Sequence, residues 1–268
     1  MAAGKAELAQ SSGGAFQAGR RVGLWLRPPG WRALPDGDRR QVRVLAWTAI
    51  AAQAAFVLGW LLGRALEDGY SPIRDYVSEL GREGAAAPWT FGVTVVIWGA
   101  GFAALGLALV PTLRGRPWSR IAPALFALAG ILAILLVAFR LDCATTMSHT
   151  CKAMREAGTL SWHDYAHGWS SVALEATLWL TPFALARAVW PSRLSRLLLL
   201  GGAAMGVAIG VVWATGVGWG PSAGLVQRLE LFVVHGWVLA WAAALIIEAS
   251  PGWPPERRTP HASLVTAR

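Results

Sequence analysis

Ionisable and hydroxyl side chains repeat at every fourth position between residues 163 and 175. His163, His167, Ser171 and Glu175 follow one another at this spacing. Residues i and i+4 share one face of an α-helix, so the four would form a single polar stripe. Imidazole and carboxyl groups transfer protons and bind metal ions. This stripe is therefore the first candidate for a chemical site.

The two histidines have the His-x-x-x-His spacing with which a pair of imidazoles binds one metal ion, such as zinc. The motif is similar to the His-Glu-x-x-His of zinc proteases, but Asp164 stands where the catalytic Glu would be. Ser161 and Asp164 also have the Ser-x-x-Asp spacing of a helix capping box. The sequence thus leaves two interpretations open: a zinc site, or a hydrogen-bonded polar cluster without a metal. A third zinc ligand would come from one of Asp75, Asp142 and His235.

Long apolar runs position these residues. The chain has 268 residues, of which 55% are hydrophobic and only 15% charged, whereas a soluble domain has about 25% charged residues. The apolar residues gather in runs of about 20, the length that crosses a bilayer. They predict an all-α fold, a bundle of six transmembrane helices. The predicted spans are 44–65, 89–110, 121–139, 168–190, 194–217 and 229–248.

The basic residues follow a membrane topology. The net charge is +9, and the 24 lysines and arginines concentrate in both tails and in alternate connections. The positive-inside rule then predicts that both termini are cytoplasmic. Residues 1–42 and 250–268 would be cytoplasmic tails without fixed structure, flanking a membrane domain at 43–249. The Ala-, Gly- and Arg-rich composition favours a bacterial plasma membrane. The sequence lacks a basic face with interleaved aromatics, so it does not predict a nucleic-acid partner.

With this topology, nearly all polar residues of the membrane domain lie at the outer face. Arg228 and His235 are seven residues apart and share a helix face, so spans four and six would face each other across a small pocket. Glu175 in lipid must be protonated or paired, with Arg228, His235 or a stripe histidine as its partner. In the alternative interpretation, each polar group bonds separately to the backbone or extends towards water.

Two further patterns concern packing. Cys143 and Cys151 share one outer connection, where an oxidising environment predicts a structural disulfide worth about 3 kcal/mol. A redox pair would more often have Cys-x-x-Cys spacing. Small residues recur at every fourth position in the first and fifth spans, including Gly59, Gly63 and Gly202, and predict close helix packing.

Short motifs resemble one known family. Tyr70-Ser71-Pro72 followed by 75–81 (Asp-Tyr-Val-Ser-Glu-Leu-Gly), and Gly224-Leu-Val-Gln227-Arg228, are similar to signatures of domain-of-unknown-function family 998, which has Glu where Gln227 stands. Asp142 and His163 also fit the family pattern. The resemblance covers roughly 44–248 and implies a bacterial or archaeal membrane protein with about six spans. It implies no activity, because none is established for the family.

Three functions fit the polar outer face, and the sequence does not decide whether the protein is an enzyme. A membrane enzyme would act on a lipid-like substrate at the outer leaflet, with His163, His167 and Asp142 as acids, bases or metal ligands. Its pocket would be completed by Asp75, Ser78, Arg228 and His235. A non-catalytic assembly or sensing protein would use the same residues to hold its loops together. A proton-coupled transporter would use Glu175 and His235 as a relay, although the inner halves of the spans hold few polar residues.

Overall fold

The computed structural model describes residues 34–215 and 220–250, and in these residues every regular element is a helix. This confirms the predicted all-helical fold. The elements are α2 (Asp36–Leu66), the 3₁₀ helix η1 (Val77–Gly81), α3 (Pro88–Thr112), α4 (Ile121–Ala138), α5 (His149–Glu156), α6 (Trp162–Ala188), α7 (Arg193–Thr215) and α8 (Ala223–Glu248).

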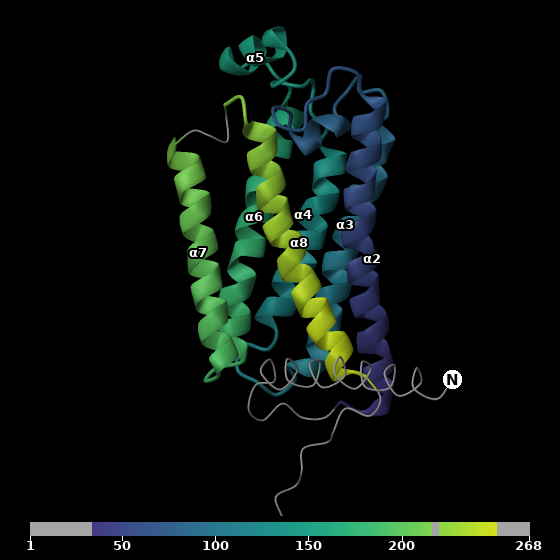
Figure 1. The fold of residues 1–268 in the computed structure, drawn as a ribbon, viewed down its shortest axis with the longest axis vertical. Coiled ribbons are helices and arrows are strands. Elements are labelled where there is room, and N and C mark those ends of the chain that lie inside the picture. The colour runs from purple at the N-terminus through teal and green to yellow at the C-terminus, as the bar shows by residue number, and fades with distance from the viewer. Residues whose placement is uncertain (1–33, 216–219, 251–268) are drawn as a thin grey trace, which may run out of the picture.

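The long helices run side by side, and the short helix α5 lies beyond one end of them together with the connection that follows α2 (Figure 1). We call this end the α5 end. Four of the described helices are long and apolar enough to cross a membrane, namely α2, α3, α4 and α8. Helix α6 is not among them, because it carries the polar stripe that ends at Glu175.

The first helix begins earlier than the sequence predicted. Residues 36–42, assigned to the N-terminal arm, form its first two turns. Asp36 and Asp38 lie in the first turn, where negative charge complements the partial positive charge of a helix N-terminus. The rest of the predicted arm, the tail from residue 251 and residues 216–217 of the fifth predicted span lie outside the described residues.

Small residues let the helices approach closely, as the sequence predicted. Gly59 and Gly63 of α2 face Thr94 and Thr90 of α3, and a Cβ atom at Gly63 would lie 2.8 Å from the Thr90 hydroxyl. Dispersion contacts at such short range hold helices together in an apolar environment. The two glycines therefore fix the packing of α2 against α3.

Helix α7 packs against α6 in the same way. A Cβ atom at Gly206 would lie 2.8 Å from the Trp179 ring, and the indole of Trp179 donates a 2.9 Å hydrogen bond to the Gly202 carbonyl. Helix α6 also packs against α4, whereas α8 packs against α2. Helices α6 and α8 are thus held by different neighbours.

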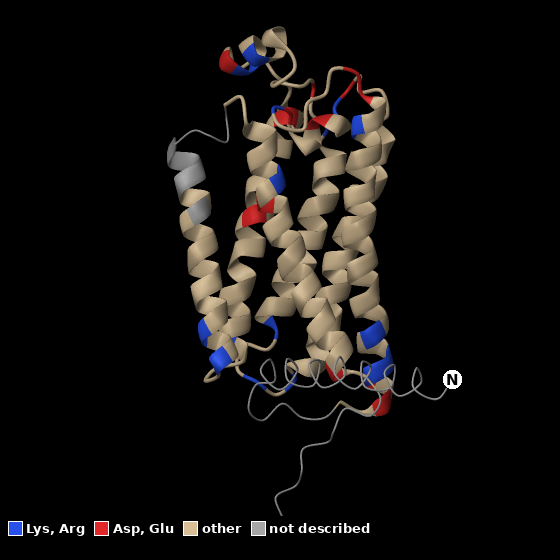
Figure 2. Cartoon of the chain, in the orientation of Figure 1, with Lys and Arg blue, Asp and Glu red and all other residues tan. Residues whose placement is uncertain are grey.

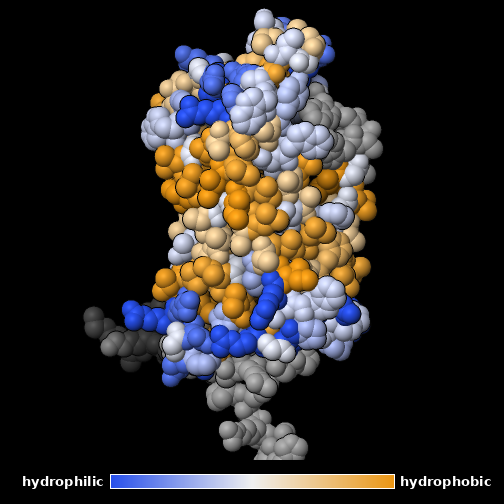
Figure 3. Space-filling model, turned by 180° about the vertical axis from the view of Figure 1, so that it is seen from behind, coloured by the Kyte–Doolittle hydropathy of each residue, from blue (hydrophilic) through white to orange (hydrophobic). Residues whose placement is uncertain are grey.

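The surface divides into three bands. On the face seen in Figure 3, a hydrophobic belt crosses the middle of the molecule, and hydrophilic side chains cover both ends. Most acidic side chains gather at the α5 end, whereas lysine and arginine predominate over acidic residues at the opposite end (Figure 2). A belt of this kind fits lipid contact and leaves the charged residues for the two aqueous sides.

Candidate functional site

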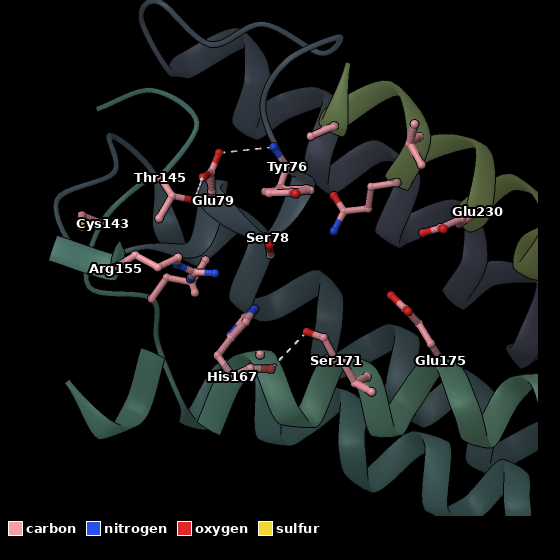
Figure 4. A pocket seen from close by; sticks show the side chains of 16 residues that line it. Tyr76, Ser78, Glu79, Cys143, Thr145, Arg155, His167, Ser171, Glu175 and Glu230 are labelled. Carbon is pink, nitrogen blue, oxygen red and sulfur yellow. Dashed lines mark hydrogen bonds between the residues drawn. The ribbon is translucent and has the colours of Figure 1, made fainter. Parts of the chain in front are cut away.

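A cavity of about 160 Å³ lies near the α5 end, between α6, the start of α8 and the connections around η1 and α5 (Figure 4). A second cavity of about 80 Å³ adjoins it. The two share five lining residues, Ser78, Ser171, Glu175, Gln227 and Glu230. The second cavity is otherwise lined by apolar side chains, among them Phe56, Trp98 and Leu178. A cavity with many polar side chains on its wall therefore adjoins one whose other side chains are apolar.

Three members of the predicted stripe line the first cavity: His167, Ser171 and Glu175. Figure 4 shows them along one side of α6, at the helical spacing that the sequence predicted. The fourth member, His163, is not part of the lining. Its Nδ1 lies 3.0 Å from the hydroxyl of Ser161.

His167 has one ring nitrogen bonded and one free. Its Nδ1 lies 2.8 Å from the Phe139 carbonyl and 3.0 Å from the Leu136 carbonyl, at the end of α4, where carbonyls lack helical partners. Since a carbonyl only accepts, Nδ1 carries the proton and Nε2 has the lone pair. Nε2 is buried and has no hydrogen-bond partner in the described part of the chain. The ring, 4% exposed, lies on the cavity wall.

Glu79 on η1 belongs to the cavity wall but was not among the predicted site residues. Its carboxylate accepts hydrogen bonds from the backbone N–H of Tyr76 and Thr146, at 3.2 and 3.0 Å, and from the Thr145 and Thr146 hydroxyls. Burial raises the pKa of Glu79 from its ordinary value, and these hydrogen bonds oppose the rise. The only sequence signal was its place in the motif 75–81, which gave no role.

Asp75 and Arg228 join the connection after α2 to α8. The carboxylate of Asp75, fully buried, accepts from the backbone N–H of Ser71 at 2.6 Å and from Arg74. Arg228 donates to the carbonyls of Pro72 and Asp75 at 2.7 and 2.9 Å. Arg228 therefore bonds to backbone carbonyls. It does not pair with Glu175, for which it was one of the predicted partners.

The two sequence motifs that suggested the family meet at this point. Arg228 also donates to the Tyr70 hydroxyl at 2.5 Å, and its guanidinium lies over the Tyr70 and Trp60 rings. Gly224 lies directly against the backbone of Asp75, where a Cβ atom would collide with the Asp75 carbonyl. Gln227 accepts a 2.6 Å hydrogen bond from the Val77 N–H. The first motif is thus bound to the second by hydrogen bonds and by close backbone approach.

Asp142 and Asp164 organise the start of α6. Asp142 accepts from the backbone N–H and hydroxyl of Ser161 at 2.6 and 2.5 Å. Ser161 is the predicted N-cap and accepts from the Asp164 N–H at 3.4 Å. The Asp164 carboxylate does not complete a capping box. It binds Arg155 of α5 at 2.8 Å and the Asp142 N–H at 3.1 Å instead.

His235 lies apart from the cavity. Its Nδ1 is 2.6 Å from the Gln53 side-chain oxygen, which also accepts from the Trp98 indole at 2.8 Å. This network connects α8, α2 and α3 inside the bundle. His235 is thus not the partner of Glu175. Instead, Glu175 and Glu230 point into the same space from α6 and α8 (Figure 4), and Glu230 was not among the predicted site residues.

The predicted disulfide is present. Cys143 and Cys151 are bonded, with Cα atoms 5.9 Å apart. The bond attaches the connection after α4 to the first turn of α5, a helix that the sequence did not reveal. Ser148 caps this helix by accepting from the Cys151 N–H at 3.3 Å. The bond thereby fixes the segment from which Thr145 and Thr146 donate hydrogen bonds to Glu79.

The zinc interpretation of His163 and His167 finds no third ligand nearby among the described residues. In the described ranges, no group of three His, Cys, Asp or Glu residues lies close enough to hold a metal ion. His163 and His167 bond to separate partners through Nδ1. Of the three suggested third ligands, Asp142 binds Ser161 and His235 binds Gln53. The third, Asp75, binds Ser71 and Arg74. The polar-cluster interpretation agrees better with these contacts.

Comparison with known proteins adds one finding. Residues 50–244 match the model of a family described as "Protein of unknown function (DUF998)". Neither the curated proteins nor the solved structures gave a match. The family match covers most of the chain and includes both motifs joined by Arg228. The chain belongs to the DUF998 family.

Proposed function

We propose that the protein crosses a bacterial plasma membrane six times, with both termini in the cytoplasm and the α5 end outside. The hydrophobic belt and the basic opposite end support this orientation. The disulfide at the α5 end also supports it, because such bonds persist in oxidising compartments. Helices α6 and α7 would be the two spans beyond the four apolar ones. Residues 43–249 would form the membrane domain, with tails at 1–42 and 250–268.

We propose further that the two adjoining cavities bind a lipid-like amphiphile from the outer leaflet. The observation that carries this proposal is that a cavity with many polar side chains on its wall adjoins one lined mainly by apolar side chains. A molecule with a polar head and an apolar chain is complementary to that pair of surfaces. Binding sites of this kind are concave, largely apolar and oriented by a few polar groups.

His167 would supply the chemistry if the protein is an enzyme. The residue lines the cavity, its Nε2 has no partner in the described residues, and the two carbonyls at Nδ1 hold the ring in the tautomer that accepts a proton. A base of this kind takes a proton from a hydroxyl group or a water molecule that attacks the substrate. The wall residue Ser78 lies across the cavity from it (Figure 4).

One observation favours a non-catalytic binding or assembly protein instead. Asp75, Asp142 and Arg228 all make hydrogen bonds that tie the connections of the α5 end together. Such contacts need no reaction to explain them. A transporter is less supported, because the proposed relay partner His235 is bonded to Gln53, inside the bundle.

A substitution at Gly168 tests the binding site. Gly168 lines the cavity, and a Cβ atom there would meet no neighbour within 4 Å. The variant Gly168→Leu should therefore fold normally while its leucine side chain occupies part of the cavity. We expect the native protein, purified in mild detergent, to retain an amphiphile at close to one per chain by mass spectrometry. Gly168→Leu should lose most of it.

Gly236→Leu is the matched control, because Gly236 of α8 also has open space at its Cβ position but does not line the cavity. Equal retention by the native chain and Gly168→Leu would disprove the site. Lipid extracts from cells carrying His167→Gln then separate the two candidate functions. An enzyme predicts an altered lipid species, and a binding protein predicts unchanged extracts.

A further inference from the structure

The cavity that we propose for an amphiphile has more acidic than basic side chains on its walls. Glu79, Glu175 and Glu230 contribute carboxyl groups, and Arg155 is the basic side chain in the lining. The cavity residues alone thus leave negative charge without compensation. Which ligand fits depends on which of these groups are already bonded within the protein.

Glu79 and Arg155 are already bonded. Glu79 accepts from Tyr76, Thr145 and Thr146, and its side chain is held by both of its oxygens. Arg155 donates to Asp164 at 2.8 Å. Neither group is therefore available as the main contact of a charged ligand.

Glu175 and Glu230 are not bonded in this way. In the described residues, neither carboxyl group has a hydrogen bond or an ion pair with the protein. They approach the same space from α6 and α8 (Figure 4), at the join between the polar and the apolar cavity. Two carboxyl groups in a half-buried position without a cation are unfavourable, and a positive charge between them would remove the penalty.

A second and independent feature also points to a polar ligand in this cavity. The Nε2 atom of His167 is buried, unpartnered in the described residues and on the wall of the same cavity. His167 and Glu175 are eight residues apart, which is about 12 Å along a helix axis. His167 would therefore meet a different part of the head group than Glu175 does, and that part must donate a hydrogen bond.

Building on the proposed function, we infer that the ligand is an amphiphile with a protonated amine. The amine lies between Glu175 and Glu230, and a hydrogen-bond donor of the head group faces His167. The chain of the ligand extends into the adjoining cavity, between Trp98 and Leu178. An ammonium group offers both the positive charge and several N–H donors to the two carboxyl groups.

The test compares two probes that differ only in the head group, dodecylamine and dodecanol. The full chain in non-ionic detergent is titrated with each probe near neutral pH, and binding is followed by native mass spectrometry. We expect the native protein to bind dodecylamine at least about tenfold more tightly than dodecanol. The double variant Glu175→Gln/Glu230→Gln should bind both probes with similar affinity, because amides keep the shape and lose the charge.

The matched control is Glu83→Gln/Glu156→Gln, which removes the same charge from exposed positions at the same end of the molecule. It should keep the preference for the amine. Equal affinity of the native protein for both probes would overturn the inference, as would a preference that survives in Glu175→Gln/Glu230→Gln.

The Gly168→Leu variant distinguishes this failure from failure of the binding site. If both probes bind equally and Gly168→Leu weakens both, the amphiphile site stands and the amine is wrong. If the native protein binds neither probe, the site and the amine fail together.

Discussion

At the scale of single residues, the polar groups of the α5 end divide into two kinds. Arg228 donates to backbone carbonyls of a neighbouring segment, and the Asp75 carboxylate accepts from Ser71, Arg74 and Thr146. His167 and Glu175 present groups to a cavity without protein partners in the described residues. The first kind stabilises the fold, and the second kind is available to a ligand.

Arg228 provides a residue-scale prediction about stability. Its planar guanidinium reaches three carbonyls and the Tyr70 hydroxyl at once, and it stacks on two aromatic rings. Lysine keeps the charge but has neither the planar shape nor the number of donors. We expect Arg228→Lys to lose at least about 2 kcal/mol of stability, which lowers the midpoint of thermal unfolding by about 5 °C.

Arg64→Lys is the control for this measurement, because Arg64 is exposed near the end of α2. Unfolding can be followed by tryptophan fluorescence in detergent. An Arg228→Lys protein as stable as Arg64→Lys would show that the Arg228 contacts do not hold the α5 end together.

At the scale of elements, small residues lock α2 to α3 and α6 to α7, and hydrogen bonds from the connections hold the α5 end. The connection after α2 is tied by Glu67, which binds Arg82 and accepts a 2.7 Å hydrogen bond from the Ala86 N–H. The connection after α4 is tied by the disulfide and by Thr146. The second tie lies at the cavity, whose wall includes Glu79, Cys143 and Thr145.

Glu67 gives an element-scale prediction about pH. Burial raises its pKa, but the Ala86 N–H and Arg82 outweigh burial, so the net pKa lies below the ordinary value of 4.5. The folded state then binds the proton less readily than the unfolded state. The Glu67 contribution to stability is therefore full above the unfolded value of 4.5 and is lost as the pH falls through the folded pKa.

The measurement is the thermal midpoint of the native chain and of Glu67→Gln near pH 7 and at acidic pH. The native protein should be more stable near neutrality, and the difference should shrink on acidification. Asp68→Asn, at the exposed neighbouring position, should show no such difference. A difference between the native chain and Glu67→Gln that stays constant with pH would contradict the role of the Glu67 contacts.

At the scale of the whole molecule, the distribution of charge and of hydrophobic surface supports the proposed orientation. The hydrophobic belt separates an end rich in acidic residues and bearing a disulfide from an end rich in arginine. Because positive charge is retained on the cytoplasmic side, this asymmetry predicts one orientation.

Single introduced cysteines test this orientation. We expect Asp68→Cys, at the α5 end, to react with a membrane-impermeant maleimide on intact cells. Pro117→Cys, in the exposed connection between α3 and α4, should react only after the membrane is permeabilised. The parent chain serves as the blank, because Cys143 and Cys151 are bonded to each other. The reverse labelling pattern would invert the proposed topology.

Much of the element scale followed from the sequence, because its causes are local. An apolar run of about 20 residues forms a helix in lipid whatever its neighbours are, since only a helix satisfies its own backbone groups. The stripe of His167, Ser171 and Glu175 needed only the helical repeat, and the disulfide needed only two cysteines in one connection. Helix α5 was missed, because it is only eight residues long and mostly polar.

The partners of the polar residues were decided by the tertiary structure. Spacing predicted that Glu175 lies on the polar face of its helix, but not that it lies near Glu230. It likewise placed Arg228 near the end of the bundle, but did not reveal its hydrogen bonds to the carbonyls of Pro72 and Asp75. Such pairs join segments more than 50 residues apart, so their geometry depends on how the helices pack. Sequence alone thus determined a helical membrane protein of this family with a polar end. Packing determined which polar groups hold that end together and which line the cavity.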